Sequence, residues 1–145
     1  MISDLGSHIT LMSKAKVKKI ALSVLFCLYI AAVAYLCFAK PDQMPQLPKT
    51  WFGLPSDKVG HFLMFLPFPL LAFMTFEGKD ISLGRKLMLL GVIIAAGAGM
   101  AIGTEHIQAQ LGYRAAEHTD MLADTAGLIA GTAATLTYIL SGKKK

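Results

Sequence analysis

Apolar and polar positions occur in long blocks along this chain. Positions 20–38 read IALSVLFCLYIAAVAYLCF and hold no charged residue, a run long enough to cross a hydrocarbon core of about 30 Å. Further apolar segments occupy 59–76, 87–103 with a continuation past Gln108, and 121–140. We therefore predict an all-α polytopic membrane protein, built as a bundle of four transmembrane helices.

Two prolines interrupt the second apolar segment. Pro67 and Pro69 lie near the middle of 59–76. Proline removes a backbone donor, and inside a bilayer neighbouring groups must satisfy the carbonyl that this leaves free. We expect a kink at this point, with a re-entrant segment as the alternative.

Basic residues gather beside the apolar segments. Ten of the 14 lysines and arginines lie in three patches, at 14–19, 79–86 and 143–145. With four spans these patches fall on one side of the membrane, and the remaining four basic residues fall on the other: Lys40, Lys49, Lys58 and Arg114. Because cytoplasmic loops are enriched in lysine and arginine, both termini are predicted to be cytoplasmic.

The amino-acid composition agrees with a membrane protein and argues against nucleic acid as a binding partner. The chain is 54% hydrophobic and only 16% charged, whereas an ordinary soluble domain is about 25% charged. Its basic residues lie where anionic lipid headgroups attract them, so we predict no nucleic-acid partner. The expected organisation is a basic tail at 1–19, a membrane domain at 20–140 and a second basic tail at 141–145.

Polar side chains converge on the ends of three predicted helices. Asp57 and His61 are four residues apart at the start of the second helix, and Glu105 and Gln108 are three apart near the end of the third. Residues at these spacings share a helix face. With the predicted orientation, all of them lie near the outer boundary of the membrane.

The fourth helix carries acids and glycines in one stripe. Asp120, Asp124, Gly127 and Gly131 follow one another at intervals of four, three and four residues. Small residues at this spacing let two helix backbones approach closely. The glycines should therefore press against another helix, which points both carboxylates into the bundle, where they need partners. The available cations are Lys58, His61 and Arg114.

The combined pattern resembles the VanZ-like family of small bacterial membrane proteins, which is named for a protein linked to teicoplanin resistance. It spans a motif core at 57–131, with matches at Asp57, Lys58, His61, Phe62, Glu105, Gln108, Arg114, Glu117, Asp120, Gly127 and Gly131. Glu117 stands where the family usually has Asp, and Asp124 stands where Asn is common. The resemblance implies a multi-pass protein of the bacterial cytoplasmic (inner) membrane and supplies no mechanism.

Three functions are consistent with these residues. The leading hypothesis is an outward-facing polar pocket that binds a lipid or lipid-linked cell-envelope molecule through Lys58, Gln108 and Arg114, with an effect on susceptibility to glycopeptide or other envelope antibiotics. The second is a membrane enzyme that acts on an envelope lipid by acid–base chemistry. Its candidate catalytic residues are Asp57, His61, Glu105, Asp120 and Asp124. The third is a small dimeric transporter.

Structural roles are the alternative for the same residues. Asp57 suits a helix N-terminus, and Glu105 could pair with Arg114. We predict no cofactor and no metal, because neither an HExxH nor a paired-cysteine pattern is present. The residue types of an oxygen-and-imidazole metal site occur at His61, Glu105, Asp120 and Asp124. Intrachain packing is expected for the glycines, with a homodimer through the Gly99/Gly103 or the Gly127/Gly131 face as the alternative.

Overall fold

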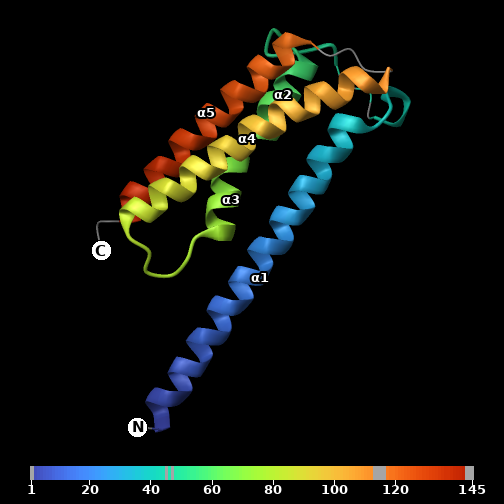
Figure 1. The fold of residues 1–145 in the computed structure, drawn as a ribbon. Coiled ribbons are helices and arrows are strands. Elements are labelled where there is room, and N and C mark those ends of the chain that lie inside the picture. The colour runs from blue at the N-terminus through green and yellow to red at the C-terminus, as the bar shows by residue number, and fades with distance from the viewer. Residues whose placement is uncertain (1, 45, 47, 113–116, 143–145) are drawn as a thin grey trace.

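The structure, a computed structural model, describes residues 2–44, 46, 48–112 and 117–142. The long elements in this part of the chain are helices (Figure 1): α1 (Ile2–Phe38), α2 (Ser56–Phe65), α3 (Phe68–Phe76), α4 (Leu83–Leu111) and α5 (His118–Ser141). A short 3-10 helix (Pro41–Gln43) and a two-stranded antiparallel pair, β1 (Thr50–Trp51) and β2 (Leu54–Pro55), lie between α1 and α2. The all-α class is therefore confirmed.

Helix α1 is longer than its apolar segment, and its N-terminal half extends beyond the other helices (Figure 1). The sequence predicted a membrane helix from position 20, whereas the helix begins at Ile2. Lysine is a good helix former, so the basic residues at 14–19 continue the helix. Farther along, Phe26 packs on α3, with ring centroids 6.2 Å from Phe68 and 5.5 Å from Phe76.

The expected interruption of the second segment divides it into α2 and α3. Helix α2 ends at Phe65, and α3 begins at Phe68, just after Pro67. The Tyr29 hydroxyl of α1 donates a hydrogen bond to the Met64 carbonyl oxygen beside the break. A partner from a neighbouring helix thus satisfies one backbone group at the point where the helix is broken.

The glycine stripe of α5 was predicted to press against another helix, and that helix is α2. A Cβ atom added at Gly127 would meet the Phe62 carbonyl oxygen, and one added at Gly131 would meet the Leu66 carbonyl oxygen. The two backbones therefore touch, which glycine alone allows. Gly99 and Gly103 on α4 have no such neighbour within 4 Å.

Within the described part of the chain, three helical segments are long and apolar enough to cross a membrane: Lys14–Phe38, Ser56–Phe76 and Leu83–Leu111. Many large apolar side chains on their surfaces are exposed, which is expected where lipid replaces water as the solvent. An apolar core lies between α3, α4 and α5 and includes Phe73, Leu90 and Leu128. The structure therefore describes a helical membrane protein with a core at one end and a polar region at the other.

Candidate functional site

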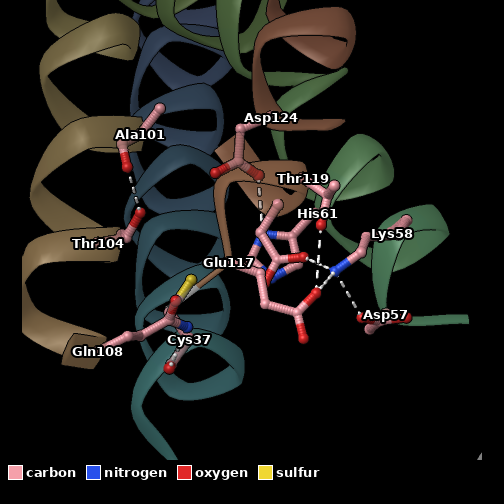
Figure 2. A network of polar contacts seen from close by, with 11 residues as sticks. Cys37, Asp57, Lys58, His61, Ala101, Thr104, Gln108, Glu117, Thr119 and Asp124 are labelled. Carbon is pink, nitrogen blue, oxygen red and sulfur yellow. Dashed lines mark hydrogen bonds and ion pairs between the residues drawn. The ribbon is translucent and has the colours of Figure 1, made fainter. Parts of the chain in front are cut away.

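The polar region forms where the N-terminal ends of α2 and α5 lie side by side, close to the C-terminal end of α4 (Figures 1 and 2). Helix α2 supplies Asp57, Lys58 and His61, and the first turns of α5 supply Asp120 and Asp124. Glu117 immediately precedes α5. These six residues are called the polar network below. They meet because the glycine stripe brings α2 and α5 into backbone contact one to two turns away.

Lys58 is the centre of the polar network. Its Nζ lies 2.9 Å from Asp57 Oδ2 and 2.7 Å from Glu117 Oε2, and it also contacts Asp120 Oδ1. The hydrogen bond from Lys58 lowers the pKa of Glu117, which lies outside the membrane-spanning segments. The Lys58 side chain is only 19% exposed, so its ammonium group is largely enclosed by these three acids.

His61 lies deeper and links the two acids of α5. Its Nδ1 is 2.9 Å from Asp124 Oδ1, and its Nε2 is 3.6 Å from Asp120 Oδ2. The His61 and Asp124 side chains are 5% and 0% exposed. A carboxylate on one ring nitrogen fixes the orientation of an imidazole and selects which of its nitrogens carries a proton. This pair can therefore hold a proton at a defined position.

Gln108 connects α4 to the end of α1 (Figure 2). Its Nε2 donates a 2.9 Å hydrogen bond to the Cys37 carbonyl oxygen, and the residue is 1% exposed. Glu105, one turn earlier on α4, is close enough to interact electrostatically with Asp120 and His61. Helix α4 thus brings an acid close to the polar network and uses an amide to bind α1.

Three buried acceptor oxygens in this region have no hydrogen-bond donor among the residues that the structure describes. They are Glu105 Oε1, Gln108 Oε1 and Asp124 Oδ2. A buried acceptor without a donor costs about 1–3 kcal/mol. The site therefore has unused capacity to accept hydrogen bonds.

The structure brings together most of the residues that the sequence singled out. Five candidates belong to the polar network, Glu105 lies near it, and Gln108 contacts the end of α1. Arg114 lies outside the described residues. Glu117 entered the sequence analysis only as a position of the family pattern. Its spacing of three residues before Asp120, at the start of a helix, was the signal that could have identified it as a partner of Lys58.

The acids that lie close enough together to hold a metal ion are not the four residues that the sequence suggested as metal ligands. Asp57, Glu117 and Asp120 offer oxygen atoms within 4.8 Å of one another, whereas the sequence had suggested His61, Glu105, Asp120 and Asp124. The Lys58 ammonium contacts all three acids of the observed group. A positive charge of the chain itself thus occupies the place that a metal ion would need.

Comparison with known proteins identifies a family over the part of the chain that holds these residues. The family model described as VanZ/LLP1 matches residues 26–140, which include all of the polar network as well as Glu105 and Gln108. The search of curated proteins and the search of solved structures found no match. A match over most of the chain is sufficient to assign the family. The chain is a member of the VanZ/LLP1 family.

Proposed function

We propose that this VanZ/LLP1 membrane protein crosses the bacterial inner membrane four times, with both termini in the cytoplasm. We further propose that it binds the headgroup of a lipid or lipid-linked cell-envelope molecule at the polar network. The observation that carries the binding proposal is the set of buried acceptors without donors beside an acid-rich network. An altered susceptibility to glycopeptide or other envelope antibiotics would follow if binding changed access to their lipid-linked target.

Helix α5 supports the fourth span. It holds 24 residues, which at 1.5 Å per residue gives about 36 Å, and it runs antiparallel to α4 along most of its length (Figure 1). Its outward side chains Leu122, Ile129 and Leu140 are 67%, 65% and 48% exposed, as lipid contact requires. Its acids Asp120 and Asp124 instead face α2. Four crossings place the polar network opposite the lysine-rich ends.

Labelling of single cysteines tests this topology. In a background with Cys27 and Cys37 replaced by alanine, Gln46→Cys should react with a membrane-impermeant maleimide in intact cells, and Lys79→Cys should react only after lysis. Both side chains are exposed, so neither is shielded from the reagent by the rest of the described chain. Reaction of Lys79→Cys from outside, or of Gln46→Cys only after lysis, would contradict the proposed orientation.

The charges of the network indicate which ligand groups fit it. Five acids, including Glu105, face Lys58 and the titratable His61 among the described residues, and the Lys58 ammonium already contacts three carboxylates. Such a site favours hydrogen-bond donors, namely the hydroxyls of a sugar or the ammonium of a peptide or headgroup. Asp124 Oδ2 and Glu105 Oε1 would accept from them. Arg114, three residues before Glu117 in the sequence, is the proposed ligand for phosphate, because guanidinium matches its oxygens bidentately.

One observation favours an enzyme as the second candidate. Asp124 holds the His61 ring at 2.9 Å, and the opposite ring nitrogen points toward Asp120 at 3.6 Å. A carboxylate that orients an imidazole is a recurring arrangement in acid–base catalysis. In that reading His61 would transfer a proton to or from an envelope lipid, and Asp120 or Glu105 would act as the partner base.

Lipid analysis of the gently purified protein tests the binding proposal. The wild type should retain an envelope lipid that Glu105→Gln and Arg114→Ala each reduce by about tenfold or more, as expected for the loss of one charged hydrogen bond. Asp42→Asn is the matched control, because Asp42 is an exposed acid on the same side and outside the network.

The outcomes separate the two candidates. Equal lipid content in the wild type and both variants would overturn the binding proposal. For the enzyme, envelope lipid extract incubated with the wild type should yield a product of changed mass that His61→Asn does not form. If that product is absent with the wild type as well, the catalytic candidate fails while the binding result stands.

A further inference from the structure

A cavity of about 930 Å³ opens at the opposite end of the helices from the polar network. Helix α1, the connection between α3 and α4, and the last turns of α5 surround it. Lysines dominate its charged lining, with two acids, Glu77 and Asp80, among them. The lysines are Lys16, Lys18, Lys19, Lys79 and Lys86.

We propose that this cavity binds an anionic phospholipid of the adjacent leaflet, through its phosphate and its headgroup hydroxyls. The site is separate from the polar network and does not depend on the function proposed for it. The ligand class follows from three features of the lining: its surplus of lysines, its apolar wall and one unused acceptor.

The lysine surplus selects a phosphate group. Five lysines from three parts of the chain line a common space, and the two acids balance fewer than half of their charge. Lys19 donates a 2.6 Å hydrogen bond to the Glu77 carbonyl oxygen, which joins α1 to the end of α3 and holds this side of the cavity together. An ammonium has three donors, so Lys19 keeps two that no hydrogen bond within the described residues uses. Lysine binds phosphate as a point charge and does not require one fixed geometry.

The apolar wall selects a lipid over a soluble phosphate. Leu22, Met74 and Tyr138 line the cavity beside the lysines. Phosphate at the lysines would thus place acyl chains along apolar side chains, and long lysine side chains reach from such a surface to headgroups. A free anion would use none of this surface.

The unused acceptor selects a headgroup with hydroxyls. Glu77 Oε2 is buried and has no hydrogen-bond donor among the described residues. An anionic phosphate alone would be repelled by this carboxylate. A headgroup that carries hydroxyls next to its phosphate can donate to Glu77 and receive from the lysines at the same time. Phosphatidylglycerol has this combination, whereas phosphatidylcholine has neither the hydroxyls nor the net charge.

Native mass spectrometry of the full-length protein with defined lipids tests the proposal. Palmitoyl-oleoyl phosphatidylglycerol should be retained at least about fivefold better than palmitoyl-oleoyl phosphatidylcholine. Lys79→Gln/Lys86→Gln should lower that retention by about tenfold or more, since each lysine near an anionic lipid contributes about fivefold in affinity. Lys79→Arg/Lys86→Arg should restore it. The matched control is Lys40→Gln/Lys49→Gln, which removes two exposed lysines at the other end.

Four results would overturn the proposal. They are equal retention of both lipids, unchanged retention in Lys79→Gln/Lys86→Gln, an equal loss in the Lys40→Gln/Lys49→Gln control, and displacement of the lipid by millimolar inorganic phosphate, which would identify a site for the free anion. The structure gives Lys79 and Lys86 no hydrogen bond from the side chain to the rest of the described chain, so folding should be preserved. Helical content measured by circular dichroism verifies this for each variant.

Discussion

Replacement of Lys58 by methionine is expected to lower the free energy of unfolding by about 3 kcal/mol, the range found when one partner of a buried ion pair is removed. The ammonium contacts three carboxylates, of which Asp120 is 6% exposed. Methionine keeps much of the length and apolar surface of the lysine stem but leaves these acids facing one another. The measurement is unfolding in mixed micelles by titration with dodecyl sulfate, followed by circular dichroism.

Two further variants show whether charge is the cause. Lys49→Met removes an exposed lysine from the connection between α1 and α2 and should change stability by less than about 0.5 kcal/mol. Adding Asp120→Asn to Lys58→Met should recover part of the loss, because one of the unpaired acids is neutralised. Wild-type stability in Lys58→Met would show that the network contributes nothing to folding.

Replacement of Gly131 by alanine should destabilise the protein by about 3 kcal/mol, the upper end of the usual cost of overpacking. The new Cβ would meet the Leu66 carbonyl oxygen and would lie 2.9 Å from Pro69 Cδ. Backbone and proline cannot rotate away as a flexible side chain would, so α2 and α5 must separate. The same unfolding titration measures the effect.

Gly99→Ala is the matched control for this substitution. Gly99 lies inside a helix and has nothing within 4 Å of its would-be Cβ, so alanine should raise stability by up to about 1 kcal/mol through helix propensity. Equal effects of Gly131→Ala and Gly99→Ala would contradict the close contact between α2 and α5. The alternative of a homodimer through Gly99 and Gly103 is open to the same variant, since a lower dimer fraction of Gly99→Ala in lipid would support it.

Most of the helices could be predicted from the sequence, because a membrane helix requires a long run of apolar residues and such a run is visible in the sequence. The intervals between Asp120, Asp124, Gly127 and Gly131 also indicated which face of α5 is buried, since helical spacing is a local property. Pro67 marked the break between α2 and α3 for the same reason. All of these features follow from residues that are near one another in the chain.

Contacts between distant segments were less accessible to prediction. Lys58 was named both as a possible partner of the acids of α5 and as a ligand for an anionic group, but not as the residue that joins Asp57, Glu117 and Asp120. Which acid contacts which cation depends on the register of α2 against α5. That register cannot be predicted from the spacing of residues within either helix. The lysine-lined cavity was missed for a related reason. Its basic patches were interpreted one by one as topology signals, and only folding brings Lys19 to Glu77.

The backbone contact at Gly127 and Gly131 has a mechanical consequence for the protein in its bilayer. Because main chain meets main chain there, the spacing of α2 and α5 does not depend on flexible side chains that could be compressed or stretched. A change in lipid length is met by tilting of helices. Helices α2 and α5 should therefore tilt together as one rigid body. The contacts of Lys58 and His61 with their acids should then be the same in membranes of different thickness.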